Sequence, residues 1–376
     1  MKIPFLNLKQ RYNFKDYKFS LVLLVLAISM IGIFMVGSAN AEYQPKQIMG
    51  VVLGLIAMAV ISLIDYKWIL NFYWLMYIVN LLLLLAVVFF GTNANGATRW
   101  LDLGFIQFQP SDLTKLITIL FFARFLSKKE EMINDKKTIL EAIGLMIPSL
   151  ILVYKQPSLS ATICITALFC VIMFMAGLSY KFIGTVLVIT IPTVALLIGI
   201  VVQPNQPFLK EYQQKRILAW LEPEAYATEE AYQQLNSVMA IGSGQLDGKG
   251  YNSDATTSVK NGNFILEPQT DFIFAIIGEE LGFVGCCAVI ILLLLIVIEC
   301  IVIGLKAKDT GGRIICGGVG ALIGIQTFIN ISVATGIFPN TGISLPFVSY
   351  GLTSLICFFM GIGFVLNVGL QPKKYQ

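Results

Sequence analysis

Asp271 stands where a long polar stretch gives way to the apolar residues 272–305. A carboxylate at such a boundary is partly removed from water, which raises its pKa and makes it a better proton acceptor. A helix beginning near Phe272 acts in the opposite direction, because a helix N-terminus favours negative charge. Position alone favours the plainer interpretation, in which Thr270 or Asp271 caps that helix. General-base chemistry is the alternative.

Glu279 and Glu280 follow one to two turns inside the same apolar segment. Ionisable side chains within a membrane span are costly, so both are candidates for a functional role. The alternative is a structural pair with a Lys or Arg of a neighbouring helix.

Four glycines surround Lys249. A nucleotide-binding P-loop needs four residues between its first Gly and the Gly-Lys pair, whereas Gly244 leaves three and Gly242 leaves five. The spacing excludes a nucleotide site, and we expect these glycines to set turns.

A second polar stretch, residues 96–115, brings cationic and acidic side chains together. Pro110 suits the first turn of a helix, and Asp112 and Lys115 then share one face of it. The plainer interpretation is a helix start with a local ion pair. The functional alternative is a polar pocket wall, in which Arg99 and Lys115 face an anionic headgroup.

Residues 335–351 are rich in Gly and Pro and interrupt the apolar pattern near the end of the chain. This predicts a re-entrant segment or tight turn, polar enough to face a water-filled cleft. The plainer interpretation is a structural turn.

These residues must be positioned by apolar helices. The chain is 57% hydrophobic and 13% charged, whereas a soluble domain carries about 25% charged residues. The composition predicts an all-α integral membrane protein with one polytopic domain over residues 1–376. The absence of histidine excludes a His base, a His zinc site and His haem ligation. All seven cysteines lie in apolar runs, which favours packing over disulfides.

The apolar runs predict about ten transmembrane helices. We retain the first as a span, because it is long for a signal peptide and more spans follow. The eighth is too long for a straight span, since its 34 residues reach about 51 Å against a core of about 30 Å. We expect it to bend at Gly278, Gly282 or Gly285. The predicted spans are 19–36, 47–64, 70–90, 112–127, 138–154, 158–176, 182–202, 272–305, 313–335 and 346–368.

The distribution of positive charge predicts the orientation. With ten spans, 17 of the 26 Lys and Arg residues lie on the side of the amino terminus. Because positive charge marks the cytoplasmic side, we expect residues 1–18 and the carboxyl end to be cytoplasmic. The polar loop 203–271, between spans seven and eight, would then be extracellular.

Taken jointly and in order, several of these stretches resemble the SEDS (RodA/FtsW-type) family of bacterial cell-wall polymerases, and most of all its RodA-like elongation branch. The resemblance covers the chain from about residue 90 to its end. The matching stretches are residues 96–100, 109–112, 212–223, 236–250, 270–285 and 326–351.

The resemblance implies a peptidoglycan glycosyltransferase of the bacterial cytoplasmic membrane, which polymerises lipid II at the outer face in cell-wall synthesis and cell-shape maintenance. The family's catalytic aspartate, in a Thr-Asp-Phe-Ile-Phe motif, corresponds to Asp271, which becomes the expected base. The lipid pyrophosphate leaving group would need cationic help, from side chains or from a divalent cation such as Mg²⁺ or Mn²⁺. The candidate substrate-binding residues are Arg99, Trp100, Lys115, Arg216, Ser243, Lys249, Glu279, Glu280 and Ser349.

Three departures from the family pattern stand out, of which one keeps the charge: Asp112 stands where the family has Glu. The His that usually precedes the Thr-Asp pair is replaced by Gln269, and Ser158 stands where the family often has an aspartate. The missing His and Ser158 favour one alternative to the polymerase, a non-catalytic scaffold for a transpeptidase. The polytopic form and the charged groups inside spans allow another, a lipid II flippase. An intact Asp271 argues against the scaffold.

The resemblance also implies partners: lipid II, membrane lipid and a class B penicillin-binding protein, and no nucleic acid. We expect the single span of that transpeptidase to dock on spans eight and nine, where small residues allow close helix approach. The alternative is that these residues serve internal packing or bending. They are Gly282, Gly285, Gly317, Gly318, Gly320 and Ala321.

Overall fold

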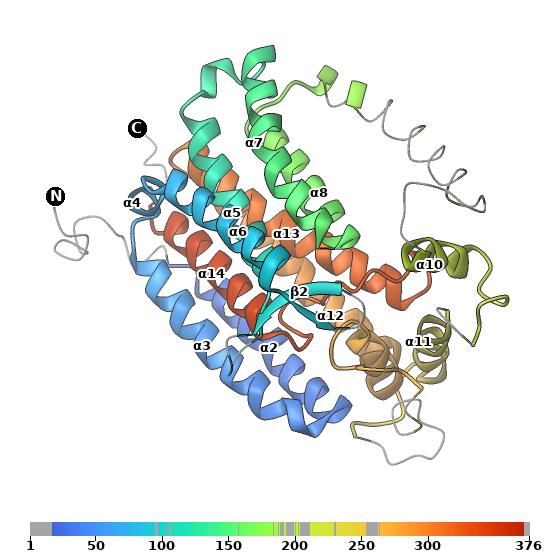
Figure 1. The fold of residues 1–376 in the computed structure, drawn as a ribbon. Helices are drawn as coiled ribbons and strands as arrows, with labels where there is room; N and C mark the ends of the chain where they lie inside the picture. Colours follow the sequence, from blue (N-terminus) through green and yellow to red (C-terminus); the bar gives the residue numbers. More distant parts are fainter. Residues whose placement is uncertain are drawn as a thin grey trace.

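The structure, a computed structural model, is a bundle of helices with one small sheet (Figure 1). It describes residues 17–94, 97–102, 104, 107–156, 158–182, 184–186, 188, 192, 199, 201, 203, 211–228, 231–252, 262 and 264–371. The elements in order are α2 (Phe19–Ala39), η2 (Ala41–Tyr43), α3 (Gln44–Leu63), α4 (Tyr66–Leu70), α5 (Tyr73–Phe90), β1 (Thr92–Ala94), β2 (Ala97–Asp102), β3 (Gln107–Phe108), α6 (Pro110–Ser127), η3 (Glu130–Met132), α7 (Lys136–Lys155), α8 (Leu159–Met175), α10 (Glu211–Leu221), α11 (Tyr232–Ser243), α12 (Ile273–Leu305), α13 (Thr310–Ala334) and α14 (Leu352–Gly369).

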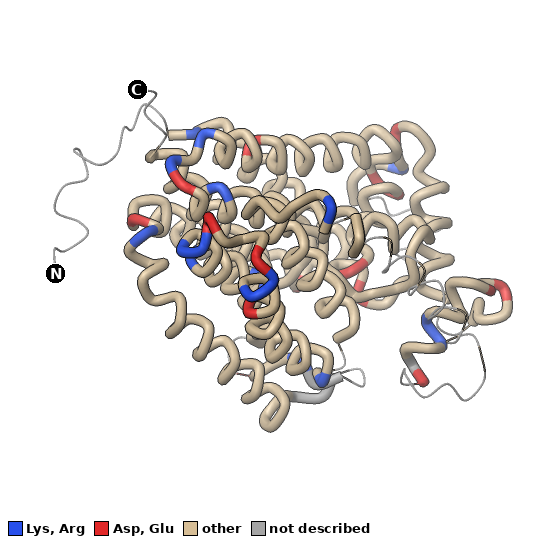
Figure 2. Tube along the Cα trace, turned by 90° about the horizontal axis from the view of Figure 1, so that it is seen from above, with Lys and Arg blue, Asp and Glu red and all other residues tan. Residues whose placement is uncertain are grey.

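Seven helices of the described part are long and apolar enough to cross a membrane, namely α2, the η2–α3 unit, α5, α7, α12, α13 and α14. Helices such as α2, α5 and α12 expose large apolar side chains on their outer faces, as helices surrounded by lipid do. Figure 2 shows long stretches of helix without charge, and charged residues gathered mainly at helix ends and connections. The prediction of a mostly helical membrane protein is confirmed.

Nine of the ten predicted spans coincide with helices, once α6 and α8 are included. The last begins at Leu352 rather than at residue 346, because Pro346 and its neighbours form a buried turn before α14. The predicted seventh span, 182–202, and the predicted amino-terminal segment, 1–18, lie mostly outside the described residues.

Helices α6, α13 and α14 form the centre of the bundle and are buried over most of their length. Glycines in α13 let neighbouring helices approach closely. A Cβ at Gly317 would lie 2.4 Å from Met175 of α8, one at Gly318 would lie 2.8 Å from Ile119 of α6, and one at Gly320 would lie 3.1 Å from Cys300 of α12.

These contacts correct the predicted docking surface on spans eight and nine. The three glycines of α13 face other helices of the bundle, and Gly282 faces residues of the long loop. A Cβ at Gly285 would meet Leu281 of its own helix, and Ala321 packs against the core. The small residues therefore serve packing and bending, which is the alternative interpretation.

A three-stranded sheet, β1-β2-β3, lies between the third and fourth predicted spans. It is antiparallel throughout, with Thr92 opposite Trp100 and Leu101 opposite Phe108. Thr, Trp and Phe favour strands, but three short strands give too weak a pattern to be read from the sequence. The sheet places Arg99 and Trp100 on one strand, β2.

Helix α12 is broken at Gly282, whose φ of 63° and ψ of −162° are accessible chiefly to glycine. The segment 245–250 of the long loop pairs with the backbone groups that the break releases. It donates to the carbonyls of Glu279 and Glu280 at 2.9 and 3.0 Å, and it accepts from the two N–H groups after Gly282 at 2.8 and 3.2 Å. The predicted bend is confirmed, and the loop completes it.

The glycines of this segment are explained by the same contact. A Cβ at Gly244 would lie 1.9 Å from the carbonyl oxygen of Gly278, and one at Gly248 would lie 2.2 Å from that of Glu280. Gly248 and Gly250 also have positive φ, of 80° and 95°. The glycines thus set turns, as predicted, and in addition allow the loop to touch α12.

Candidate active site at the start of α12

Asp271 lies two residues before α12, and its main chain is fixed. Its carbonyl accepts a hydrogen bond from Asn330 Nδ2 of α13 at 2.8 Å. The helix is capped by Phe272 without a side-chain hydrogen bond, and the Thr270 hydroxyl donates to the carbonyl of Glu267 instead. The capping interpretation of Thr270 and Asp271 is therefore wrong. Among the described residues, none donates a hydrogen bond to the Asp271 carboxylate.

The electrostatic surroundings of Asp271 suit a proton acceptor. The side chain is half-buried, and desolvation raises its pKa to about 6. Arg216, and to a smaller extent Arg99, lower this pKa and so oppose the effect of desolvation. The Glu267 carboxylate raises the same pKa slightly further. Such a carboxylate is charged at neutral pH and still more basic than an exposed aspartate.

The Gly- and Pro-rich loop 335–351 runs past this carboxylate. A Cβ at Gly342 would lie 3.3 Å from Asp271 Oδ2 and 4.0 Å from Arg99 Nη1. Gly342 has a φ of 70°, which glycine adopts without strain. The loop therefore brings its backbone between the acid and the guanidinium, where a side chain would be in close contact with the carboxylate.

Side chains of helix α10 hold loop 335–351 in place. Arg216 Nη1 donates to the carbonyl of Asn340 at 3.5 Å, and Trp220 Nε1 donates to that of Ile337 at 3.1 Å. The Ser160 hydroxyl at the start of α8 donates to the carbonyl of Thr341. This arrangement places Arg216 beside the loop that passes Asp271.

Helix α11 fastens the end of α13 and the start of the loop. Gln234 Nε2 donates to the carbonyls of Val333 and Phe338 at 2.8 and 2.6 Å, and the Ser237 hydroxyl donates to that of Ala334 at 2.7 Å. Figure 1 shows α10 and α11 together at one end of the bundle, beside the start of α12. The polar loop thus contributes to the site through its helices.

A second group of predicted site residues gathers at the break in α12, about 12 Å along the helix from Asp271. Lys249 Nζ lies 2.7 Å from Glu279 Oε1. The Ser38 hydroxyl of α2 donates to Glu280. The Ser243 hydroxyl donates to Ala240 of its own helix at 2.8 Å. These contacts support the structural interpretation of Glu279 and Glu280.

Lys115 and Ser349 are engaged elsewhere in the bundle. Lys115 Nζ lies 2.8 Å from Asp112 Oδ1, and both residues are buried, as the local ion-pair interpretation expects. Ser349 Oγ accepts a hydrogen bond from the N–H of Leu345 at 2.7 Å and so closes the turn before α14. Of the predicted side chains, Asp271, Arg99 and Arg216 come together.

Three residues without a predicted role position the loop and the main chain of Asp271, namely Asn330, Trp220 and Gln234. For Asn330 a signal existed, since it is one of two buried amides, with Gln326, in a mostly apolar helix. Its partners lie 59 and 13 residues away, and no local pattern could identify them.

Besides Asp271, one further carboxylate, that of Glu267, acts on this site. Within the described ranges no group of three or more acidic or cysteine side chains could hold a metal. Mg²⁺ and Mn²⁺ prefer oxygen ligands, whereas the charged neighbours that lower the pKa of Asp271 are arginines. The cationic groups at this site are guanidinium groups.

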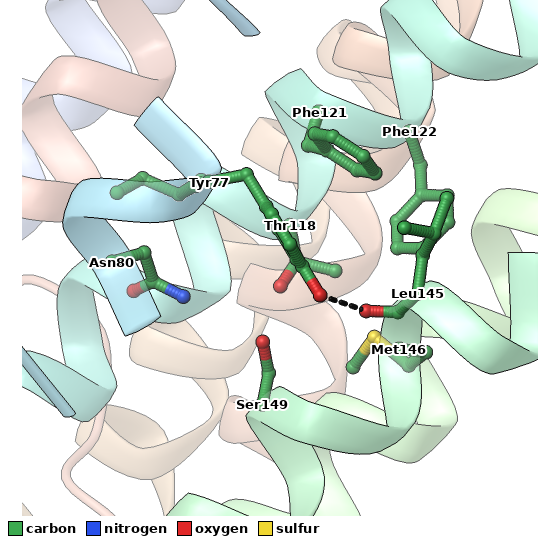
Figure 3. A pocket seen from close by; sticks show the side chains of 9 residues that line it. Tyr77, Asn80, Thr118, Phe121, Phe122, Leu145, Met146 and Ser149 are labelled. Carbon is green, nitrogen blue, oxygen red and sulfur yellow. Dashed lines mark hydrogen bonds between the residues drawn. The ribbon is translucent and has the colours of Figure 1, made fainter. Parts of the chain in front are cut away.

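A small pocket between α5, α6 and α7 involves none of the predicted site residues. Its polar lining includes Tyr77, Asn80, Thr118 and Ser149, whose side chains are shown in Figure 3. The Tyr77 hydroxyl donates to the carbonyl of Leu145 at 2.6 Å, three residues before a proline inside α7. The contact joins α5 to α7 near the proline, where a backbone donor is missing.

The fold and site define a polytopic membrane protein with a half-buried carboxylate near two arginines at one end of its bundle. The chain belongs to the cell cycle protein family of FtsW, RodA and SpoVE, whose family model matches residues 16–374.

Relatives support this membership over almost the whole length. The chain is 32% identical over 357 residues to the peptidoglycan glycosyltransferase MrdB of Escherichia coli (strain K12), covering 94% of each chain. It is 32% identical over 387 residues to the probable peptidoglycan glycosyltransferase FtsW of Geobacter metallireducens, covering 98% of this chain and 99% of that one. A chain solved in a peptidoglycan synthase complex that coordinates polymerization and crosslinking matches with a TM-score of 0.78 and 29% identity, covering 94% and 97%.

Proposed function

We propose that this chain is a peptidoglycan glycosyltransferase that polymerises lipid II at the outer face of the bacterial cytoplasmic membrane. The names of its relatives support the reaction class. The observation that carries the proposal is the state of the Asp271 carboxylate. It is half-buried, has a pKa of about 6, and accepts no hydrogen bond from a described residue.

In the proposed reaction Asp271 is the general base. It takes the proton from a hydroxyl of the acceptor sugar while that oxygen attacks the anomeric carbon of the donor chain. The bond from the anomeric carbon to the lipid pyrophosphate breaks, and the pyrophosphate leaves with the bonding electrons. Arg216 and Arg99 are the nearest charged donors, and guanidinium groups suit phosphate oxygens in geometry and charge.

The proposed topology has ten spans, cytoplasmic termini and the loop 203–271 outside. The excess of Lys and Arg on the amino-terminal side supports it. In the bundle Lys18 lies beside Gly369, so that the start of α2 and the end of α14 share one end. Asp271 lies on the loop side, where lipid II would present its sugars.

The topology is tested by labelling. Asn252 is exposed in the long loop. A cysteine there, in a variant whose native cysteines are replaced, should react with a membrane-impermeant maleimide in intact spheroplasts. Labelling that requires membrane disruption would place the loop inside.

For a partner we propose a class B penicillin-binding protein. The match to a chain of a complex that joins polymerization to crosslinking supports this. Because the glycines of α12 and α13 are used inside the bundle, the docking surface would consist of exposed apolar side chains of those helices, such as Ile291, Leu294 and Phe328.

One assay tests the reaction. The purified protein, with and without the class B penicillin-binding protein, is incubated in detergent with labelled lipid II, and glycan products are separated by size. A polymerase forms glycan strands without a second compartment, whereas a flippase or a scaffold forms none. Absence of glycan in the presence of the partner would reject the proposal.

A further inference from the structure

Asn330 is 1% exposed and lies against the main chain of Asp271. Its amide nitrogen donates twice, to the carbonyl of Asp271 at 2.8 Å and to that of Ile343 at 2.7 Å. Both amide protons are therefore used. The reverse orientation of the amide would set its oxygen against two carbonyl oxygens, so the orientation is fixed. Its Oδ1 is buried and has no hydrogen-bond partner among the described residues.

Thr341 presents a second polar atom of the same kind. Its Oγ1 is buried and has no hydrogen-bond partner in the described part of the chain. Its backbone is anchored, since the Ser160 hydroxyl donates to its carbonyl. The residue before it accepts from Arg216, and the residue after it passes the Asp271 carboxylate. The hydroxyl thus stands on a fixed segment between these two charged groups.

Two such atoms, one on a residue that contacts the main chain of Asp271 and one on the neighbour of Gly342, indicate a site for a ligand. Most buried polar groups find a partner, because burying one without a hydrogen bond costs free energy. Buried polar atoms without hydrogen bonds near a reactive group suit a substrate that forms those hydrogen bonds. The site then discriminates against analogues that cannot form them.

The chemistry of Asn330 selects the part of the substrate. An amide oxygen can only accept, so its partner must carry an O–H or N–H group. The pyrophosphate of lipid II carries only hydrogen-bond acceptors at neutral pH and cannot donate to this oxygen. The two arginines are the donors that suit it. The amino sugars of lipid II carry hydroxyl and acetamido N–H groups.

We infer that Asn330 Oδ1 and Thr341 Oγ1 form a sugar-binding subsite for the acceptor, resting on the proposed function. Asn330 accepts a hydrogen bond from a hydroxyl or acetamido N–H of the sugar whose hydroxyl Asp271 deprotonates. Thr341 makes a second hydrogen bond to the same sugar. The two contacts hold the acceptor oxygen within reach of the Asp271 carboxylate, while the arginines face the pyrophosphate.

The test compares Thr341→Val with Thr341→Ser. Valine keeps the branched shape and removes the hydroxyl, and serine keeps the hydroxyl. In Thr341→Val the kcat/KM for lipid II polymerisation should fall about 3- to 10-fold, chiefly through KM. The Tm of the protein without substrate should stay unchanged or rise, because the hydroxyl had no partner to lose. Thr341→Ser should recover most of the activity.

The control is Thr166→Val on the exposed face of α8, whose hydroxyl donates to its own helix; its kcat/KM should match the wild type. A structural role for Thr341 would instead lower the Tm of the valine variant together with its activity. Wild-type kinetics in Thr341→Val would overturn the subsite and leave the proposed function standing.

A binding measurement separates this inference from the reaction itself. Lipid II and undecaprenyl pyrophosphate, which lacks the sugars, are compared by the rise in Tm that each causes. Thr341→Val should weaken stabilisation by lipid II alone, whereas Arg216→Gln should weaken stabilisation by both. An equal loss for both lipids in Thr341→Val would overturn a sugar subsite. If the wild type forms no glycan, the proposed polymerase activity fails, and the lipid II arm still decides whether the subsite exists.

Discussion

Two acidic regions of the same segment have opposite surroundings. Glu279 is 1% exposed and faces Lys249 at 2.7 Å, and Glu280 is buried against the Ser38 hydroxyl. Asp271, about 12 Å away along the helix, is half-buried, and its carboxylate accepts no hydrogen bond from a described residue. Protein groups therefore pair with Glu279 and Glu280 at the break. The Asp271 carboxylate before α12 remains available to a substrate.

The difference shows how a membrane enzyme can use the same type of group in two ways. A buried charge is tolerated when another protein group compensates for it, and at the break this compensation joins the long loop and α2 to α12. A reactive carboxylate must instead be reachable and weakly solvated. Whether a protein group pairs with the carboxylate decides between the structural role of Glu279 and Glu280 and the reactive role of Asp271.

The sharpest way to break this comparison is Asp271→Asn. The amide has nearly the same shape, and the carboxylate makes no hydrogen bond that folding would lose. Polymerisation should fall by about 10²- to 10⁴-fold, the loss typical of a missing general base, while the Tm stays at or above that of the wild type. Near wild-type polymerisation of lipid II by Asp271→Asn would mean that the base lies elsewhere.

The matching change at the break is Lys249→Met. It leaves Glu279 buried without its cationic partner, which should destabilise the protein by about 3–5 kcal/mol. Thermal unfolding in detergent measures this, and the double variant Lys249→Met, Glu279→Gln should lose less. If Lys249→Met keeps its stability but loses lipid II binding, Lys249 belongs to the substrate site.

A smaller effect comes from the glycines of the inserted loop. Gly248→Ala places a Cβ 2.2 Å from the carbonyl oxygen of Glu280 at a φ of 80°, which should cost about 2–5 kcal/mol. Gly250→Ala has a φ of 95° with open space around it and should cost about 1–2 kcal/mol. Equal Tm values for the two variants would show that close contact with α12 contributes nothing to stability.

The sequence predicted the features that depend on local composition. Apolar run length located the helices, and the excess length of 272–305 predicted a bend at Gly278, Gly282 or Gly285, which the structure has at Gly282. The abrupt change in polarity at Asp271 predicted a desolvated carboxylate. In each case the physical cause lies within a short window of sequence.

The features that failed depend on contacts distant in sequence. Ser38 and Glu280 are 242 residues apart, and Lys249 gave no sign that it would face Glu279. The glycines of α13 are spread among mostly apolar residues, so hydropathy could not tell which face they present, and the assignment of these small residues to docking was wrong. The sheet around Arg99 was missed because its strands are only two to six residues long.

The finest test of the comparison is the pH dependence of polymerisation. Burial raises the pKa of Asp271 to about 6, and only the carboxylate form can accept a proton. The kcat/KM should therefore be level above pH 7 and fall about tenfold per pH unit well below pH 6. Arg216 lowers this pKa, whereas Glu267 raises it. Removing the positive charge in Arg216→Gln should therefore raise the pKa and move the acidic limb to higher pH by less than about one unit.

The control for this shift is Lys215→Gln, on the same helix but paired with Glu211 at 3.4 Å. It removes an equal charge without being among the groups that set the pKa of Asp271, so its acidic limb should coincide with that of the wild type. Equal shifts in both variants would indicate a general effect of surface charge on the lipid substrate. If the acidic limb moves only in Arg216→Gln, the titrating group is the Asp271 carboxylate, whose pKa Arg216 lowers. Glu279 is paired with Lys249 instead.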